Sequence, residues 1–291
     1  MLLLEKMRET KFSPSEQNVV DFILDKQEQI KIYSTTLIAG ETYTSPSILV
    51  RISKKLGFRG FNDFKDAFLE EINYLQKSFH NIDANKPFLE TDTIMNIASK
   101  ISLLKKESID DTLSLIHHDD LQKTIRYIQN ATTVKIFAVS NLCLQAEEFA
   151  FKMRHIGKRT ETYSLSNTMF QEAKMSLSTD CAICLSYSGE SPEIIRIARI
   201  LKNINIPIIT ITSIGDNQLT RLSDVIMKIT TRERSYSKIA GFSSLESISF
   251  LLDIIYSCYF KINYNDHYQY KVQLSKETEL RNINNTIIQE D

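Results

Sequence analysis

The first quarter of the chain shows apolar residues at helical spacing, with turn signals between the helical stretches. Four helices are predicted, following Ser13-Pro-Ser-Glu16, over Ser34–Gly40, over Ser45–Leu56, and from Asn62 or Asp63 onward. The first is preceded by a capping box with proline at the first helical position. Thr44 is the expected N-cap of the third helix, and Gly57 is a fitting residue just past its end. Residues 12–75 are therefore expected to fold as a compact all-α domain.

From Thr133 onward the pattern changes to short apolar runs that alternate with helical segments. The predicted strands are 134–139, 159–163, 181–185, 207–212 and 224–229. The predicted helices are 142–156, 167–177, 192–203, 216–222 and 243–261. This alternation predicts an α/β domain whose five-stranded parallel sheet is covered by helices on both faces. Ligands in that architecture bind at the carboxyl ends of the strands.

Polar segments mark the expected boundaries between these parts. A polar stretch from His80 to Leu89 is interpreted as a linker, and helical patterns follow at about 91–105 and 108–129. The polar tail after Asn263 is expected to hold a helix at 272–288. The predicted division is 1–78 for the helical domain, 79–106 for a linker with a helix, 107–263 for the α/β domain and 264–291 for the tail.

Composition narrows the class of protein. Apolar residues make up 42% and charged residues 24% of the chain, as in an ordinary globular protein with room for two domains. The net charge of −1 argues against a general polyanion-coating protein, so nucleic acid would have to bind a local patch. Cys181 and Cys184 fall in one predicted strand without a second pair for zinc, so we expect buried reduced thiols and no metal. The start lacks a signal-peptide pattern and the apolar helix at 245–260 is interrupted by Asp253, so we expect a cytoplasmic protein without a membrane partner.

The most informative stretch runs from Ser186 to Glu193, between a predicted buried strand and a predicted helix. It carries three hydroxyls and a glycine, at Ser186, Ser188, Ser191 and Gly189. Pro192 and Glu193 then open the helix, with proline at a first-turn position and a carboxylate beside it. Backbone N–H groups and the positive end of the helix dipole make such a turn an anion site. The ligand expected at such a turn is a phosphate monoester.

A second informative stretch lies in the predicted helical domain. No carboxylate occurs between Glu41 and Asp63, whereas four cations do, at Arg51, Lys54, Lys55 and Arg59. The first three share one helix face, because positions three and four apart are neighbours. With Ser45 and Ser47 in its first turn, this helix has the layout of the recognition helix of a helix-turn-helix, which enters the major groove of DNA. A plain solvated basic face is the alternative.

The run from Phe12 to Leu75 resembles the N-terminal domain of RpiR-type transcriptional regulators. The matching blocks are Ser13-Pro-Ser-Glu16, Thr44-Ser45-Pro46-Ser47-Ile48-Leu49-Val50-Arg51 and Lys54-Lys55-Leu56-Gly57-Phe58-Arg59-Gly60-Phe61. The resemblance implies contacts to bases or their surroundings from Ser45, Ser47 and Arg51. It implies phosphate contacts from Lys54, Lys55 and Arg59.

The segment from about Leu121 to Ile262 is similar to the sugar-isomerase (SIS) domain, a flavodoxin-like doubly wound fold that such regulators carry after their DNA-binding domain. The motif that carries this resemblance is Ser186-Tyr187-Ser188-Gly189-Glu190-Ser191-Pro192-Glu193. The resemblance implies that its serines hold the phosphate of a phosphosugar and that Gly189 allows close backbone approach. Another turn departs from the family, since Ala138-Val139-Ser140-Asn141-Leu142 stands where a G-x-G-x-S turn is usual. Ser140 and Asn141 could still cap the next helix and donate to a sugar hydroxyl.

Catalysis has to be considered because SIS domains also occur in phosphosugar isomerases. An aldose–ketose isomerisation needs a general base beside the reacting carbon. The candidates are Glu246, which also fits a capping box, and the histidines His117, His118 and His155. No acid–base pair emerges from them and no nucleotide fingerprint is present, so we expect a non-enzyme without a cofactor.

We therefore expect a DNA-binding transcriptional regulator of carbohydrate metabolism whose SIS domain senses a phosphorylated sugar. One short recognition helix reads only a few base pairs, so a homodimer or homotetramer on palindromic operator DNA is expected. The alternatives are a phosphosugar isomerase-type enzyme and a DNA-binding protein whose SIS domain only dimerises.

Overall fold

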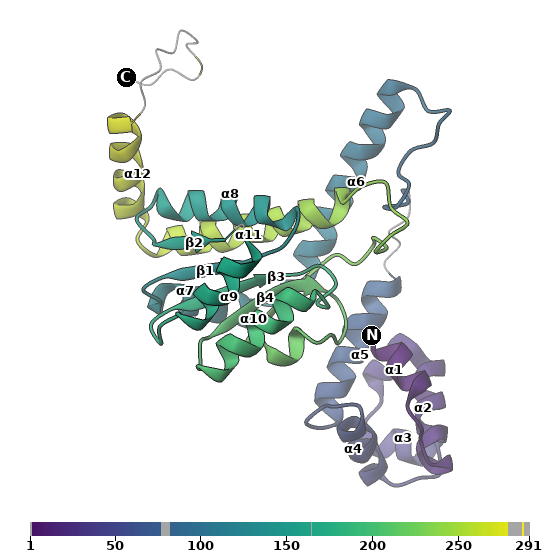
Figure 1. The fold of residues 1–291 in the computed structure, drawn as a ribbon. Helices are drawn as coiled ribbons and strands as arrows, with labels where there is room; N and C mark the ends of the chain where they lie inside the picture. The colour runs from purple at the N-terminus through teal and green to yellow at the C-terminus, as the bar shows by residue number, and fades with distance from the viewer. Residues whose placement is uncertain (1, 77–81, 164, 279–286, 288–291) are drawn as a thin grey trace. The chain divides into compact units, whose positions relative to one another are not determined.

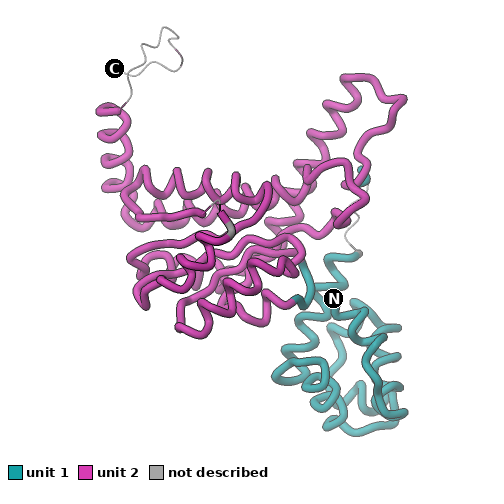
Figure 2. Tube along the Cα trace, in the orientation of Figure 1, with its two compact units in different colours: residues 1–83, 214–217 teal, residues 84–213, 218–291 magenta. Residues whose placement is uncertain are grey.

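The computed structural model describes residues 2–76, 82–163, 165–278 and 287. The chain divides into two compact units, coloured separately in Figure 2. One comprises residues 1–83 and 214–217, and the other comprises residues 84–213 and 218–291. Each unit has buried hydrophobic clusters of its own.

The first unit is built from helices that share one core. Its elements are α1 (Leu3–Glu9), α2 (Pro14–Lys26), the 3-10 helix η1 (Gln27–Ile32), α3 (Thr35–Glu41), α4 (Pro46–Lys55) and α5 (Phe61–Gln76) (Figure 1). Each of these helices buries apolar side chains in a single cluster, in which Phe64 and Phe68 are among the largest fully buried residues. Helices this short are marginal in isolation, so the shared core is what holds them.

The four helices predicted for this unit are confirmed as α2, α3, α4 and α5. The predicted capping box is formed, because the Ser13 N–H donates to Glu16 Oε2 at 2.8 Å and the Glu16 N–H donates to Ser13 Oγ at 3.4 Å. The N-cap of α4 is Ser45 rather than Thr44, one residue later than predicted. Gly57 follows α4 with a φ of 95°, the left-handed conformation expected of a residue past a helix end.

The sequence did not predict α1 or η1. The carboxylate of Glu71 on α5 accepts hydrogen bonds from the backbone N–H groups of Leu3 and Leu4, at 2.6 and 2.8 Å. Glu71 thus takes the place of a local N-cap for α1, and burial raises the pKa of its carboxyl. A cap supplied from a distant part of the chain leaves no signal beside the helix that it stabilises.

The second unit contains a five-stranded sheet with the order β2-β1-β3-β4-β5, and every neighbouring pair is parallel. The strands are β1 (Val134–Phe137), β2 (Thr160–Thr162), β3 (Cys181–Leu185), β4 (Ile208–Ser213) and β5 (Val225–Ile229). This confirms the predicted α/β fold and gives each predicted strand a counterpart. The chain moves outward from β1 to β2 and then returns to β3, so the topological switch point lies between β1 and β3.

Helices cover both faces of this sheet (Figure 1). The helices of this unit are α6 (Ile94–Ser114), α7 (His118–Asn130), α8 (Leu142–Arg154), α9 (Ser166–Lys174), α10 (Pro192–Asn203), α11 (Phe242–Ile262) and α12 (Tyr264–Thr278), with the 3-10 helix η2 (Thr220–Leu222). Side chains of α7, α8 and α11 pack on one face with Ile183 and Leu185, and those of α9 and α10 pack on the other with Ala182 and Cys184. Cys181 and Cys184 are free and buried, and burial raises the pKa of each thiol to about 12.

Four helical predictions differ from the structure in their extent. Helical patterns at about 91–105 and 108–129 correspond to a continuous α6 and to α7, with the break at residues 115–117. The predicted helix at 216–222 is reduced to η2. The tail helix begins at Tyr264 rather than at 272, and 279–286 and 288 of its predicted range lie outside the described residues. Residues 79–81 of the predicted linker also lie outside them. Among the described residues, no helix is both long and apolar enough to cross a membrane.

Candidate functional site

The turn between α3 and α4 brings two hydroxyls to the start of α4. The Oγ atoms of Ser45 and Ser47 lie 2.8 Å apart, and both residues are exposed. Leu49 and Ile52 on the same helix are buried in the core of the helical unit. A short helix, a tight turn and a second helix with an exposed polar start form the geometry of a helix-turn-helix.

The predicted cations lie along α4 and in the turn after it. Arg51 Nε donates to Glu16 Oε1 at 2.7 Å, and Lys55 Nζ lies 3.3 Å from Glu16 Oε2. Lys54 and Arg59 are exposed, and the Arg59 backbone N–H donates to Asp63 Oδ2 at 3.0 Å. The sequence identified Glu16 as a cap, but its pairing with two cations of α4 joins residues far apart in the chain and was missed.

The second predicted site forms a turn between β3 and α10. Ser186 Oγ lies 2.9 Å from Ser191 Oγ, and Ser186 is buried. Gly189 has a φ of 67°, which glycine adopts without steric cost, and its N–H donates to the Ser186 carbonyl at 3.2 Å. Ser188 is exposed, and its Oγ accepts from the Glu190 N–H at 3.2 Å. The structure therefore brings all four predicted residues of this turn together at the N-terminus of α10.

Contacts from the segment after β4 hold this turn in place. The Gly189 carbonyl accepts from the Leu219 N–H at 3.1 Å. The Glu190 carboxylate accepts from the backbone N–H of Gln218 at 3.0 Å and from its Nε2 at 2.8 Å. Three hydrogen bonds thus join the turn to residues 218 and 219.

The other two predicted ligand residues, Ser140 and Asn141, lie in the turn after β1. Phe137 pairs in register with Cys184, so the turn after β1 neighbours the turn after β3 at the same edge of the sheet. Ser140 has a φ of 58°, so the chain adopts without glycine a left-handed conformation that glycine favours. Asn141 occupies the N-cap position of α8 but makes no side-chain capping bond, so the capping expected of it is not formed. Both side chains are exposed.

The N-terminus of α11 is capped by a residue that the sequence did not single out. Glu233 Oε1 accepts from the backbone N–H groups of Ser243 and Ser244, at 2.6 and 3.0 Å. Its Oε2 accepts from Ser244 Oγ at 2.6 Å and pairs with Lys238 Nζ at 2.9 Å. Glu246, interpreted from the sequence as the capping glutamate, instead forms an ion pair with Lys105 at 2.7 Å. The cap comes from the loop before the helix, outside the reach of a local pattern.

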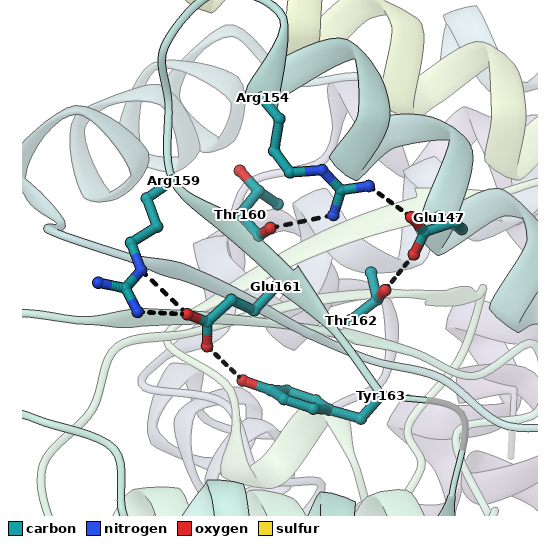
Figure 3. Close-up of a pocket in the computed structure, with 7 residues that line it drawn as sticks. All are labelled: Glu147, Arg154, Arg159, Thr160, Glu161, Thr162 and Tyr163. Atoms are coloured by element: carbon teal, nitrogen blue, oxygen red, sulfur yellow. Dashed lines mark hydrogen bonds and ion pairs between the residues drawn. The ribbon is translucent and has the colours of Figure 1, made fainter.

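A hollow of about 550 Å³ lies beside the edge strand β2 (Figure 3). It is lined by Glu147, Arg154, Arg159, Thr160, Glu161, Thr162 and Tyr163, none of them a predicted site residue. Glu161 pairs with Arg159 at 2.9 Å and accepts from Tyr163 Oη at 2.8 Å, and Glu147 pairs with Arg154 and accepts from Thr162. Each carboxylate in the hollow is thus neutralised by a neighbouring arginine, and we assign no ligand to it.

Comparisons with known proteins agree with both the helix-turn-helix and the α/β domain. The helix-turn-helix domain of the rpiR family matches residues 1–75, and the SIS domain matches residues 127–257. An uncharacterized HTH-type transcriptional regulator of Clostridium perfringens is 28% identical over 94% of this chain and 97% of its own length. The chain is a helix-turn-helix transcriptional regulator with a C-terminal SIS domain. Its two domains are a helix-turn-helix domain of the rpiR family and a SIS domain, as in an RpiR-type transcriptional regulator.

Solved structures show the same fold. The NanR protein of Vibrio vulnificus, complexed with ManNAc-6P, has a TM-score of 0.59 and 20% identity, and the match covers 95% of this chain and 98% of NanR. The sugar isomerase domain of an RpiR transcription factor from Sphaerobacter thermophilus has a TM-score of 0.56 and 13% identity, over 62% of this chain and 98% of that domain. At these identities the likeness concerns the fold.

Proposed function

We propose that this regulator binds operator DNA through α4 and senses a phosphorylated sugar at the turn after β3. The observation that carries the sensing half is the Ser186–Ser191 turn, in which three hydroxyls and a left-handed glycine lie at the N-terminus of a helix. Such a turn offers backbone N–H groups and hydroxyl donors to an anion without adding a cation. That NanR was solved with ManNAc-6P supports a phosphosugar as the guest.

The sugar itself would lie over the neighbouring turn after β1. Ser140 and Asn141 are exposed there, and the register of β1 with β3 keeps the two turns side by side. We assign Ser186, Ser188, Gly189 and Ser191 to the phosphate and Ser140 and Asn141 to sugar hydroxyls. Ligand binding then changes DNA affinity only through different affinities for the DNA-competent and DNA-incompetent arrangements of the protein.

For the DNA half, Ser45, Ser47 and Arg51 would lie at the bases, and Lys54, Lys55 and Arg59 at phosphates. A single recognition helix covers few base pairs, so we propose a homodimer or homotetramer on a palindromic operator. We also propose that the protein acts in the cytoplasm and that its parts are 1–78 for DNA binding, 79–106 as a linker, 107–263 for sensing and 264–291 as a tail.

We propose sensing rather than catalysis, in keeping with relatives named as transcriptional regulators. The carboxylate considered as a general base, Glu246, is engaged by Lys105. His155 Nδ1 lies 2.8 Å from the Phe151 carbonyl, and His118 lies 3.1 Å from Asp119, so each is engaged by its own helix.

A thermal-shift screen of the full chain tests the sensing half. Sugar phosphates, including ManNAc-6P, should raise the melting temperature by mass action on the folded state, and inorganic phosphate should do so more weakly. Ser188→Ala should abolish the shift, while the matched control Ser47→Ala in the helical unit should retain it. If no sugar phosphate shifts the melting temperature at millimolar concentration, the SIS domain has a purely structural role, and turnover of one of them would indicate an isomerase.

A further inference from the structure

Glu16 holds a position in this fold that a helix cap alone does not explain. Its side chain is 6% exposed, and its Oε2 accepts from the Ser13 N–H at 2.8 Å, as the carboxylate of a capping box does. The same carboxylate also receives Arg51 Nε at 2.7 Å and lies 3.3 Å from Lys55 Nζ. One buried group thus joins the start of α2 to the exposed face of α4.

Arg51 pairs with Glu16 through Nε, which leaves the terminal nitrogens of the guanidinium available for DNA. A guanidinium has five N–H donors, and Nε supplies one of them, so the four donors on the terminal nitrogens can still be presented outward. The Arg51 side chain is 60% exposed despite the bond. Fixing Nε fixes the plane of the guanidinium, and bidentate recognition of a guanine edge depends on that plane.

Lys55 is held in a similar way. Its Nζ lies 4.9 Å from the centre of the Phe12 ring as well as 3.3 Å from Glu16. A cation fixed by a carboxylate and a ring is less free to follow a DNA backbone than a solvated lysine such as Lys54. These contacts therefore reduce the attraction of Lys55 for DNA phosphates.

The charge of Glu16 persists at physiological pH. The hydrogen bond from the Ser13 backbone, and then those from Arg51 and Lys55, lower the pKa of Glu16 to about 2 against the opposing effect of burial. A negative charge beside a DNA-facing helix weakens sequence-independent binding, which arises from phosphate neutralisation. A glutamine would complete a capping box without that penalty.

We infer that Glu16 is a positioning residue for DNA recognition, which orients Arg51 toward a base edge and raises sequence discrimination at the expense of general DNA affinity. This rests on the proposed function, in which α4 reads operator DNA. The role differs from capping because it acts through another residue and affects the choice among sequences.

The test compares binding of the full chain to two duplexes. One is selected by the wild-type protein from a random-sequence library, and the other is a scrambled duplex of equal length and composition. Glu16→Gln keeps a capping side chain but removes the charge. It should weaken binding to the selected duplex about tenfold, the scale of one bidentate base contact. It should leave binding to the scrambled duplex unchanged or tighter, with a steeper salt dependence because Lys55 is released.

Ser13→Ala is the matched control, since it removes the other half of the same capping box and leaves the Arg51 contact. It should lower the melting temperature without changing the ratio of the two affinities. If Glu16→Gln weakens binding to both duplexes equally, so that the ratio of the two affinities is unchanged, Glu16 is only a cap and the inference is wrong.

Arg51→Ala separates this inference from the proposed function. If Arg51→Ala reduces discrimination and Glu16→Gln does not, α4 reads DNA without help from Glu16. If Arg51→Ala changes binding to neither duplex, the assignment of Arg51 fails, and the inference about Glu16 fails with it.

Discussion

The Tyr187 hydroxyl is bonded to both backbone groups of Glu233. It donates to the Glu233 carbonyl at 3.0 Å and accepts from the Glu233 N–H at 2.9 Å. Tyr187 lies inside the serine-rich turn, and the Glu233 side chain caps α11. The proposed phosphate turn is thus joined by one side chain to the loop that leads into α11.

The same loop is bonded to the segment that follows the helical unit in the chain. Asn85 Oδ1 accepts from the Arg234 N–H at 2.7 Å, its Nδ2 donates to the Arg232 carbonyl at 3.3 Å, and its carbonyl accepts from the Ile239 N–H at 2.9 Å. Asn85 stands two residues after Asp83, the last residue of the N-terminal stretch of the helical unit. A change at the phosphate turn therefore has a continuous hydrogen-bonded route to the segment that leads to the DNA-binding domain.

Tyr187→Phe should interrupt that route. Two backbone groups of Glu233 lose their partner, which should lower the free energy of unfolding by about 1–3 kcal/mol. A sugar phosphate that binds the wild type should still bind the variant but alter its DNA affinity less. Calorimetric titration and DNA binding with and without the sugar phosphate measure the two effects. Tyr236→Phe, at a tyrosine that is 98% exposed, is the control, and equal coupling in both variants would contradict the route.

Lys54→Glu tests the proposed DNA-binding face of α4 without disturbing Glu16. Lys54 is exposed, and reversing its charge should weaken duplex binding about tenfold or more at moderate salt while leaving the melting temperature unchanged. Lys261→Glu, at an exposed lysine of the sheet domain, makes the same change in net charge. Equal losses from the two substitutions would mean that net charge, rather than the face of α4, governs binding.

The acid dependence of stability should reveal the ionised state of Glu16. Its pKa is depressed in the folded chain, so its charged contacts stabilise fully above the ordinary value of 4.5 and are lost as the pH falls toward about 2. Glu16→Gln lacks this dependence. The gap between the urea midpoints of the wild type and the variant should therefore narrow from neutral pH to about pH 3. A gap that stays constant would show that the carboxylate is not ionised as inferred.

Two glycines of the helical unit should respond to alanine in opposite directions. Gly57 has a φ of 95°, so Gly57→Ala should cost about 1–2 kcal/mol of stability through backbone strain. Gly40 lies within α3, where an added Cβ would meet nothing within 4 Å, so Gly40→Ala should gain about 0.5–1 kcal/mol. Urea unfolding of both variants measures this, and a loss at Gly40 as large as at Gly57 would contradict it.

Local patterns predicted the parts of the fold that local forces determine. The strand Cys181–Leu185 and the helix that begins at Pro192 have the predicted bounds. A short apolar run predicts a buried strand, and a proline at the first position predicts the start of a helix. Three other features depend on residues that packing brings together. They are the capping of α1 by Glu71, the capping of α11 by Glu233 and the pairing of Glu16 with Arg51. The helical unit contains the prediction's largest omission, α1, because its cap lies 68 positions away.

The same difference between local patterns and long-range contacts applies to the two candidate sites. Clustering of cations and serines was visible in sequence, since each cluster lies within one short stretch of the chain. Their partners were not, because a hydrogen bond between α2 and α4 has no spacing rule. The contacts that distinguish Arg51 from Lys54 are therefore properties of the folded chain.

The double attachment of Glu16 also constrains how this regulator can evolve. A substitution that removes the capping side chain disturbs the start of α2 and the contact to Arg51 together. Such variants would be removed by selection for a stable fold before any altered DNA preference could spread. Drift in target sequence within this lineage should instead begin at an exposed position of α4 such as Ser47, where a change leaves the core untouched.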